Sequence, residues 1–571
     1  MLARLVAQIA EKLDRVAGWD RLPWPLAMLV LIGLRQRLRE RNLYDTGRAP
    51  TQPTHASGTA SARALDGSGN DPGDPGMGAV GTRFGRNAPP VLEHGDSPPP
   101  LAVSRALLTR EEFLPAETLN LLAAAWIQFE VHDWFAHQID RDDPALPLRR
   151  DRTVTPGYPA SLSEQTHWWD ASQLYGAEAD FATAIRDGDG GRIKVDDELL
   201  AAMEPFTRHR GGTTAPVPNL WIGSALFHVL FAKEHNAICD RLHHEYPALD
   251  GEGIYEKARL INAAIMAKIH TVEWTPAIIA HPATVSSIRA TWWGALGEDV
   301  RRRFGRVGSG ELLSGIPGSR RDHDGVPYAL TEEFVAVYRL HPLIPDAVDF
   351  RRASDDAPLA TWDFAEIAVA RGEPGRPRSR LLEIGTANAL YSLSRAHPGA
   401  ITLHNYPRFL QELEPIDEPG IRNLGAVDIA RTRETGVPRY NNFRRLFRLR
   451  PAASFDEIAG GNRRWAEEIR DVYAGELEAV DLLIGLLAER KPEGFAFSDT
   501  AFRVFLVMAA RRLRSDRFFT TDYTPEMYTP VGLRWIDDVT LAGMLRRHYP
   551  ELGLALEGVA NPFQPWRSAV S

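Results

Sequence analysis

Apolar side chains recur with a helical period along most of the chain. From about residue 101 onward, hydrophobic positions repeat at i, i+3 and i+4, and the alternation typical of strands is nearly absent. Several of these segments are apolar on most faces, as expected for helices buried inside a many-helix body. The pattern therefore predicts a mainly α fold in which residues 101–571 form one large helical domain. The spacing predicts helices over residues 118–138, 220–246, 254–280, 330–341, 462–489 and 500–514.

Two segments precede this domain. Residues 1–45 are expected to form an N-terminal helical extension that carries the apolar stretch Leu22–Leu34 and, after it, an arginine-rich stretch. Such a stretch can lie in a membrane interface or pack on the protein's own core, and the sequence favours neither. Residues 46–100 are rich in Gly, Pro, Ser and Asp, a composition typical of turns and irregular chain, so we expect a segment that wraps the core.

The composition narrows the class of protein. The 571 residues are 44% hydrophobic and 25% charged, the balance of a soluble globular protein. The net charge of −9 argues against a general nucleic-acid binder. A single cysteine, Cys239, excludes a disulfide framework and favours a reducing compartment such as the cytoplasm. No apolar run reaches the roughly 20 residues that a membrane helix requires.

A glutamine and a histidine share one face of the first predicted helix of the domain. Gln128 and His132 are four residues apart, and their neighbours are bulky and mostly apolar. Polar groups aimed into apolar surroundings must find partners or line a cavity. By itself the pair is compatible with a cavity and with an ordinary histidine satisfied inside the core.

A candidate calcium site follows from oxygen-bearing residues. Asp133 points about 100° away from His132 around the helix. Oxygens of Thr166, Asp170 and Ser172, with the carbonyl of Trp168, could surround a hard cation, and Asp133 would help complete the cage. A polar turn that caps the next helix is the alternative.

A tyrosine and a histidine stand at a second candidate position. Tyr338 and His341 are three residues apart on the predicted helix 330–341, and Pro342 should end or kink that helix. A histidine at a helix end with a phenol one turn behind suits an axial haem ligand beside an oxidisable tyrosine. An aromatic residue and a histidine in an ordinary core are the alternative.

Taken together and in order, the local motifs resemble those of the animal haem peroxidase–cyclooxygenase superfamily. Further motifs resemble more closely the plant fatty acid α-dioxygenases within it. The superfamily motifs are TRFGRN at 82–87, QFEVHD at 128–133, THWWDAS at 166–172, KEHN at 233–236, YRLHPLIPD at 338–346 and RTRETGVPRYN at 431–441. The closer motifs are AKIHTVEWT at 267–275, HNYPRFLQEL at 404–413 and DRFFTTDY at 516–523.

The resemblance implies a helical fold with haem b held between core helices. It makes His341 the proximal iron ligand, places His132 on the distal side with Gln128 nearby, and makes Asn441 the hydrogen-bond acceptor for His341. It also implies a calcium ion. The implied calcium ligands are Asp133, Thr166, the carbonyl of Trp168, Asp170 and Ser172.

The substrate residues are also implied by the resemblance. Tyr338 corresponds to the tyrosine that forms the radical, His270 and Arg517 would hold a fatty acid carboxylate, and Thr275 would orient it. Arginine suits a carboxylate because it donates paired charge-assisted hydrogen bonds. A carboxylate fixed beside Tyr338 presents the adjacent α-carbon to the radical.

Departures from the mammalian peroxidases refine the expectation. Their haem-linked aspartate before the distal histidine is replaced by Val131, and the family spacing puts Val217 and Leu220 where a distal arginine and a second haem-linked glutamate would stand. We therefore expect non-covalent haem and disfavour a halide-oxidising peroxidase.

The sequence thus predicts an oxidoreductase, a haem-dependent fatty acid α-dioxygenase. Its expected partners are a long-chain fatty acid, O2 and a peroxide activator, and the product is a 2-hydroperoxy fatty acid. A cyclooxygenase-like dioxygenase of other regiospecificity and a haem peroxidase of small organic donors are the alternatives. We expect a cytoplasmic protein, with peripheral membrane contact through the N-terminal segment left open.

Overall fold

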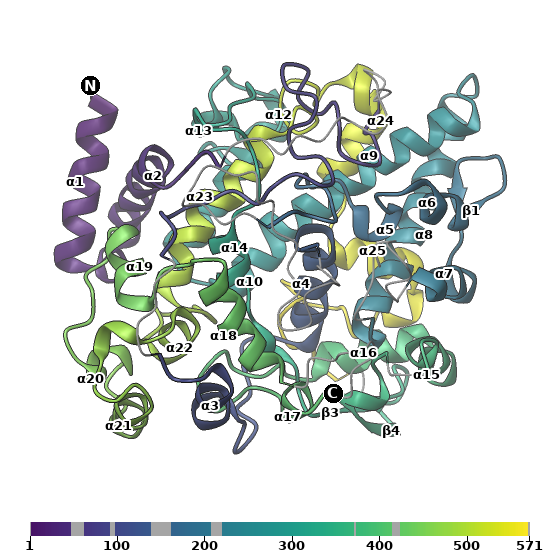
Figure 1. The fold of residues 1–571 in the computed structure, drawn as a ribbon. Helices are drawn as coiled ribbons and strands as arrows, with labels where there is room; N and C mark the ends of the chain where they lie inside the picture. The colour runs from purple at the N-terminus through teal and green to yellow at the C-terminus, as the bar shows by residue number, and fades with distance from the viewer. Residues whose placement is uncertain are drawn as a thin grey trace.

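The described part of the chain folds into a mainly helical body (Figure 1). The predicted mainly α class is confirmed. The computed structural model describes residues 2–46, 62–91, 97–138, 161–206, 220–369, 373–413 and 423–568.

Helix α4 (Leu121–Trp134) lies in the middle of the body (Figure 1). It packs against α8 (Ile222–Glu245) and α16 (Thr386–Arg395), and α8 packs in turn on α9 (Gly251–Ile269). Because α4 is apolar on nearly every face, it can be covered on all sides. Only Gln128 and Val131 of this helix are less than fully buried.

Two N-terminal helices form a hairpin at one edge of the molecule (Figure 1). Helix α1 (Leu2–Ala17) packs on α2 (Trp24–Arg41), and α2 contacts α11 (Pro282–Trp293) and α23 (Asp499–Ser515). One face of the apolar stretch in α2 is buried on the core, at Ala27, Val30, Leu31 and Leu34. The opposite face leaves Trp24, Leu26 and Leu29 exposed.

The segment 62–91 is irregular and follows the surface of the core. Isolated bridges join Arg83 to Leu162 and Gly85 to Thr331. The guanidinium of Arg86 is fully buried and lies 2.8 Å from the carboxylate of Glu333. The division of the chain at residues 45 and 100 stays a prediction.

The remaining helices are mostly short, and the described strands form two small antiparallel hairpins. The strands are β1 (Arg186–Asp187) with β2 (Arg192–Ile193), and β3 (Ala347–Arg351) with β4 (Pro358–Asp363). The other helices are α3 (Pro100–Val103), α5 (Ser172–Tyr175), α6 (Ala179–Ala184), α7 (Asp196–Met203), α10 (Thr275–Ile278), α12 (Glu298–Phe304), α13 (Glu311–Ser314), α14 (Glu332–Val337), α15 (Arg376–Ile384), α17 (Arg408–Gln411), α18 (Leu424–Glu434), α19 (Tyr440–Leu446), α20 (Phe455–Ile458), α21 (Arg463–Val472), α22 (Leu482–Ala488), α24 (Pro525–Asp538) and α25 (Leu541–His548). Single 3₁₀ turns span Trp19–Arg21, Glu204–Phe206, His341–Leu343, Phe364–Glu366, Leu477–Ala479 and Pro550–Leu552, and π-helical segments span Ser104–Leu108 and His270–Trp274.

Two predicted helices were too long. The helix predicted over 462–489 is divided into α21 and α22, because Ala474 and Gly475 adopt positive φ angles of 51° and 82°. The helix predicted over 330–341 ends at Val337, so Tyr338 and His341 do not share one helical face. His341 begins a separate 3₁₀ turn.

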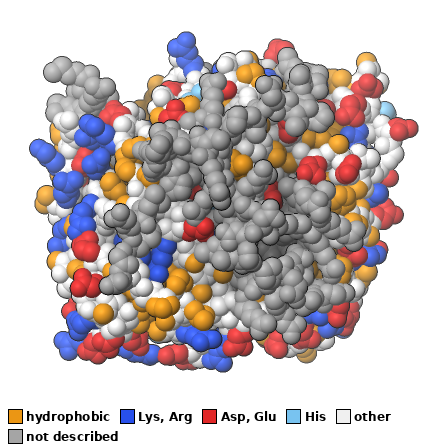
Figure 2. Space-filling view, in the orientation of Figure 1, with side chains coloured by type: hydrophobic (Ala, Val, Ile, Leu, Met, Phe, Trp, Pro, Cys, Tyr) orange, Lys and Arg blue, Asp and Glu red, His pale blue; other side chains and the backbone are white. Residues whose placement is uncertain are grey.

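Figure 2 shows acidic and basic side chains interspersed over the face seen in Figure 1, with blue side chains gathered along the edge where α1 lies. Among the described helices, none is both long and apolar enough to cross a membrane.

Candidate active site

A buried cavity, called the central cavity below, lies between α4, the π-helical segment, α11, α14 and α23. Its lining contains His270 and Thr275, which were predicted to bind substrate, and Tyr338, the predicted radical residue. Much of the remaining wall is aromatic and aliphatic. The lining residues used below are Arg35, Trp134, Trp169, His270, Thr275, Ile288, Phe334, Tyr338, Phe505, Leu506, Ala509 and Arg512.

Tyr338 follows α14 directly and is packed among aromatic rings. Its ring centroid lies 4.7 Å from that of Phe334, 5.7 Å from that of Trp134 and 6.0 Å from that of Phe135. Burial raises the pKa of the phenol above its usual value of 10.0. Tyr338 therefore keeps its O–H at neutral pH and can lose it only as a hydrogen atom or as a coupled proton and electron.

His270 begins the π-helical segment after α9, and single π turns of this kind are frequent at functional sites. The indole N–H of Trp126 donates to Nδ1 of His270 over 3.1 Å. The imidazole ring of His270 stacks on the ring of Trp274, with centroids 4.6 Å apart. Burial, and then the charge of Arg512, holds the pKa of His270 well below 6.5. A neutral ring whose Nδ1 accepts carries its proton on Nε2, so His270 presents an N–H donor.

Thr275 lies five residues beyond His270, one turn along the π-helical segment, where its backbone N–H donates to the carbonyl of His270. Its side chain is 1% exposed, and Oγ1 is buried without a hydrogen-bond partner. A buried hydroxyl without a partner costs free energy, so it is suited to bind a polar ligand group. The structure thus brings Tyr338, His270 and Thr275 to one cavity.

Arg512, which lines this cavity together with Arg35, was not identified from the sequence. Its guanidinium lies between two indoles, with Cζ 3.9 Å from the ring centroid of Trp134 and 4.3 Å from that of Trp169. Nε and Nη2 are buried without hydrogen-bond partners. Oδ2 of Asp133 lies 3.9 Å from Nη2, too far for a hydrogen bond. Arg512 therefore has donors available for an anionic ligand.

The structure does not bring Arg517 to the central cavity. Arg517 follows the end of α23, where its guanidinium pairs with Asp522 and lies over the ring of Phe518 at 4.1 Å. The four residues between Arg512 and Arg517 span the end of the helix, so the two side chains leave in different directions. For the carboxylate, the geometry favours Arg512 in place of the predicted Arg517.

His132 and Gln128 stand on the face of α4 that is least covered. His132 is 9% exposed, and its Nδ1 is buried without a hydrogen-bond partner. Burial, and then the nearby His228, lowers the pKa of His132 to about 3, so its ring is neutral. Gln128, one turn earlier, is half-buried, as is Val131.

His341 has a different partner from the one predicted. Its Nδ1 lies 2.8 Å from Oδ2 of Asp428, a residue of α18 that is fully buried. Asn441 is occupied elsewhere, because its amide donates to the carbonyl of Ala452 and its side-chain oxygen accepts from the N–H of the same residue. The prediction that Asn441 accepts from His341 is therefore wrong in this structure.

The residues around His341 and His132 fit a haem group. The side chain of His341 is 27% exposed, and its Nε2 is turned from the Asp428 contact. Nearby, Nε of Arg339 and of Arg431 are buried without hydrogen-bond partners, and both residues line a pocket between α14 and α18. Two histidines and two arginines with donors to spare suit a porphyrin iron and its propionates. Val131 supplies no carboxylate for a covalent link.

The predicted calcium loop folds against α4. Oδ1 of Asp133 accepts from the N–H of Ser172 at 2.6 Å and from its hydroxyl at 2.8 Å, and Thr166 donates to Oδ2 of Asp170 at 2.9 Å. The second oxygens, Oδ2 of Asp133 and Oδ1 of Asp170, are buried without partners. Burial, and then the charge of Asp170, raises the pKa of Asp133 to about 8. Trp168 is buried, and its indole donates to the carbonyl of Gly67 at 2.9 Å.

These atoms suit a hard cation, which would neutralise two neighbouring carboxylates and supply the missing partners. Among the described residues, no group of three or more His, Cys, Asp or Glu side chains surrounds one point. A calcium ion here would therefore take two carboxylates and complete its shell with hydroxyl and carbonyl oxygens, which is the set predicted from the sequence.

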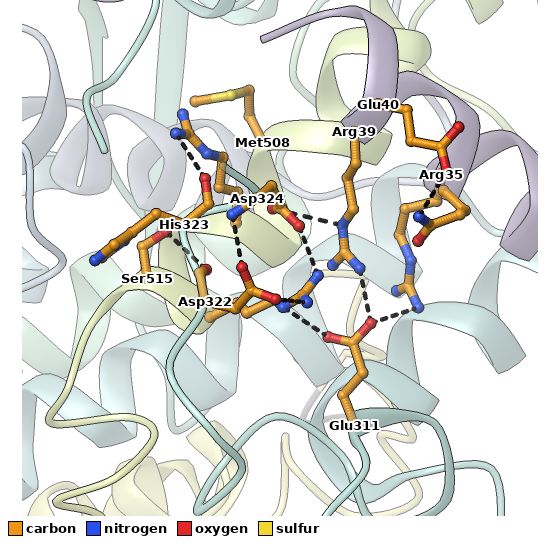
Figure 3. Close-up of polar contacts among 12 residues, drawn as sticks. Arg35, Arg39, Glu40, Glu311, Asp322, His323, Asp324, Met508 and Ser515 are labelled. Atoms are coloured by element: carbon orange, nitrogen blue, oxygen red, sulfur yellow. Dashed lines mark hydrogen bonds and ion pairs between the residues drawn. The ribbon is translucent and has the colours of Figure 1, made fainter. Parts of the chain in front are cut away.

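An ion-pair network joins Arg35 and Arg39 of α2 to Glu311 of α13 (Figure 3). Arg35 lines the cavity, and its Nη2 lies 3.7 Å from Oε1 of Glu311, which is 2.7 Å from Nη1 of Arg39. Burial raises the pKa of Glu311, but Arg39 and Arg35 outweigh it and lower the pKa to about 2. In the same network, Nη1 of Arg514 lies 2.7 Å from Oδ1 of Asp324.

Comparisons with known proteins agree with this arrangement. The family model for animal haem peroxidases matches residues 62–156 and 139–558. The chain is 34% identical to alpha-dioxygenase PIOX of Nicotiana tabacum, over 100% of this chain and 92% of that protein, and 35% identical to alpha-dioxygenase 1 of Capsicum annuum over the same shares.

A solved structure extends the likeness to three dimensions. The crystal structure of fatty acid alpha-dioxygenase from Oryza sativa superposes with a TM-score of 0.89 at 33% identity, covering 99% of this chain and 97% of that one. A tyrosine-to-phenylalanine variant of the rice protein, solved with palmitic acid, matches equally well. Peroxidase A of Dictyostelium discoideum, 18% identical with a TM-score of 0.67, shares the fold. The chain therefore belongs to the animal haem peroxidase family and, within it, to the α-dioxygenases.

Proposed function

We propose that this protein is a haem-dependent fatty acid α-dioxygenase in which Tyr338 removes a hydrogen atom from C2 of a long-chain fatty acid. One observation carries the proposal: a buried phenol, a buried cation and two neutral donors line the same cavity. The palmitic acid bound to the similar rice protein supports the class of substrate.

Arg512, His270 and Thr275 bind the carboxylate. Arg512 provides the charge, and Nε2–H of His270 and the Thr275 hydroxyl add two neutral hydrogen bonds, so the unpartnered donors are satisfied when substrate enters. Because the carboxyl carbon is fixed, the only methylene held beside Tyr338 is C2. The acyl chain runs along the apolar wall formed by Ile288, Phe505 and Leu506 toward Arg35.

The reaction at C2 requires a tyrosyl radical. Haem b, when bound, supplies the one-electron oxidation of Tyr338 driven by peroxide. His341 would hold the iron, His132 and Gln128 would lie on its other side, and Arg339 and Arg431 would bind the propionates.

The radical form of Tyr338 takes a hydrogen atom from C2 and becomes a phenol again, and the carbon radical adds O2. The peroxyl radical then recovers a hydrogen atom from Tyr338, which yields the 2-hydroperoxy acid and restores the phenoxyl radical. The aromatic wall around Tyr338 excludes water from these intermediates.

Substrate is drawn from a lipid surface through the α1–α2 hairpin, in a protein that is otherwise cytoplasmic. A second small cavity, lined by Met28, Ile32, Arg35, Leu312 and other residues, adjoins the central cavity at Arg35. Trp24, Leu26 and Leu29 of α2 and Leu312 and Leu313 of α13 are exposed apolar side chains on two helices that line this cavity. Such side chains suit peripheral contact with a bilayer.

Product analysis tests the function. The haem-loaded protein, given palmitate and a trace of peroxide in air, is expected to yield 2-hydroperoxypalmitate and its decarboxylation product, the aldehyde one carbon shorter, as identified by mass spectrometry. Oxygen at a mid-chain carbon would instead indicate a cyclooxygenase-like enzyme. Oxidation of small phenols without any lipid product would indicate a peroxidase.

Replacing His341 with Ala is expected to abolish stable haem binding, because the ligand to the iron is lost. The absorption spectrum after reconstitution with hemin measures this as loss of the Soret band. His404→Ala is the matched control, since His404 lies in another part of the chain and pairs with Glu468 at 2.6 Å. A Soret band of unchanged position and intensity in His341→Ala would contradict proximal ligation.

Calcium removal is expected to lower the melting temperature. A ligand present at 100 times its Kd stabilises the folded state by about 2.7 kcal/mol. Calorimetry with calcium and with EGTA measures the difference, which Asp133→Asn should eliminate. Glu130→Gln should retain it, because Glu130 is also a buried carboxyl on α4, with a pKa raised to about 8 by burial, but bonds to Trp169 instead. Equal melting temperatures with calcium and with EGTA in the wild type would refute the site.

The calcium effect depends on pH with a definite sign. Burial and Asp170 raise the pKa of Asp133 to about 8, compared with about 3.9 in an unfolded chain. Without metal, the protonated carboxyl stabilises the fold below pH 4, and this contribution is lost as the pH rises through about 8. Calcium binds the ionised carboxylate, so its affinity and its stabilising effect should increase over the same range.

A further inference from the structure

A single arginine stands between the central cavity and the second, smaller cavity. Arg35 of α2 lines both cavities, and so do Ser287 and Thr291 of α11, so the two cavities meet between these helices. Beyond this junction the wall of the second cavity is largely apolar and includes Met28 and Ile32 of α2. An acyl tail that passes Arg35 therefore reaches further apolar surface.

Arg35 is held only loosely at this junction. Its Nη1 donates to the hydroxyl of Thr291 over a long 3.4 Å, and its Nη2 lies 3.7 Å from Oε1 of Glu311, beyond hydrogen-bond distance. Figure 3 shows Arg35 and Arg39 directed at the same carboxylate oxygen of Glu311, which Nη1 of Arg39 contacts at 2.7 Å. Arg39 therefore anchors the carboxylate, and Arg35 has no short contact with it.

We propose that Arg35 determines how the enzyme selects fatty acids by chain length. Acids whose tails end before Arg35 are held entirely in the central cavity. The tail of a longer acid displaces Arg35 from Thr291 and enters the second cavity. The inference rests on the proposed function, since it takes the carboxylate to be bound at Arg512, and it adds the residue that divides shorter from longer substrates.

The displaced arginine has an acceptor close by. When Nη2 closes the gap to Oε1 of Glu311, Arg35 exchanges a partner on α11 for a partner on α13, which widens the junction beside α11. A carboxylate oxygen has two lone pairs, so Oε1 can accept from Arg35 and keep its bond to Arg39. A long neutral contact is replaced by a charge-assisted hydrogen bond, which offsets part of the cost of the movement.

Equilibrium binding tests the proposal, because affinity does not depend on the route by which the acid enters. Saturated fatty acids from decanoate to arachidate are titrated into the haem-loaded protein without O2 or peroxide, and calorimetry measures each Kd. Each methylene buried against an apolar wall tightens binding about fourfold. In the wild type this gain is expected to stop at the length that reaches Arg35 and to resume for longer acids.

Two substitutions should change the affinity for long acids in opposite directions. In Arg35→Ala the guanidinium no longer fills the junction, so the interruption should disappear and the long acids should bind more tightly than in the wild type. In Ile32→Phe the larger ring fills the second cavity, so these acids should lose about fourfold for each methylene that no longer fits. Acids shorter than the interruption should keep their affinity in both variants. Glu311 retains Arg39 in Arg35→Ala, so no buried carboxylate is left unpaired.

Arg41→Ala is the matched control, because Arg41 is an exposed arginine at the end of the same helix and lines neither cavity. It should leave the whole series unchanged. A wild-type profile in either Arg35→Ala or Ile32→Phe, or an equal loss at every chain length, would overturn the inference. Should Arg35→Ala fail to fold, a wild-type profile in Ile32→Phe would overturn it alone. Failure of the proposed function shows separately, as oxygen added at a carbon other than C2 or as absence of fatty acid binding from the wild type.

Discussion

Oxygenation of palmitate is expected to fall by at least ~10³-fold when Tyr338 is replaced with Phe, equivalent to a barrier about 4 kcal/mol higher. Phenylalanine keeps the ring that packs against Phe334 and Trp134 but has no O–H bond, so no hydrogen-abstracting radical can form. Oxygen consumption with palmitate measures the loss. Haem content, followed by the Soret band, should not change, because Tyr338 is not proposed as a ligand.

The matched control is Tyr549→Phe, which removes another buried phenol outside the central cavity. Its oxygenation rate should equal that of the wild type. The radical assignment fails if Tyr338→Phe oxygenates palmitate at the rate of Tyr549→Phe.

Arg512→Gln is expected to lower kcat/KM for palmitate by about 10²- to 10³-fold, because removing one member of a buried charge pair costs roughly 2–5 kcal/mol. Most of the effect should appear in KM. The carboxylate would then rely on His270 and Thr275 alone, so the share of oxygen added at C2 should also fall. Steady-state kinetics and product analysis measure the two effects.

Arg517→Gln tests whether the carboxylate binds Arg512, as the structure favours, or Arg517, as the sequence predicts. Its guanidinium pairs with Asp522 outside the central cavity, so the variant should keep KM within about twofold of the wild type. Melting temperatures of both variants separate binding from stability, since Arg512 also packs between Trp134 and Trp169. The opposite result, a large rise in KM for Arg517→Gln and none for Arg512→Gln, would show that Arg517 binds the carboxylate.

Much of the fold could be predicted because helical periodicity is a local property. The segments that became α4, α8 and α23 were predicted within a few residues, since each is a long apolar run without a glycine or proline near its middle. The ends of the helices were harder to predict from the sequence. The break at Ala474 and Gly475 is made by a backbone turn, and the early end of α14 depends on how Tyr338 packs among rings from α4.

Those parts of the candidate site whose residues come from one short segment of the chain could be predicted from the sequence. Gln128 with His132, and the loop from Thr166 to Ser172, are close in sequence and were found there. Contacts between distant segments could not be predicted in this way. Asp428 lies in a helix far along the chain from His341, and no spacing rule relates the two residues. Arg512 carried a signal that was overlooked, since Phe505, Ala509 and Arg512 fall on one otherwise apolar face of α23.

The place of Arg512 has a thermodynamic consequence. Its Nη2 is 3.9 Å from Oδ2 of Asp133, so a single guanidinium stands between the proposed calcium loop and the proposed carboxylate site. Without calcium, and above the pKa of about 8 at which Asp133 ionises, its charge competes with the fatty acid for this cation; with calcium, the competition is removed. Linkage then requires reciprocity: calcium tightens fatty acid binding by the same factor by which the fatty acid tightens calcium binding.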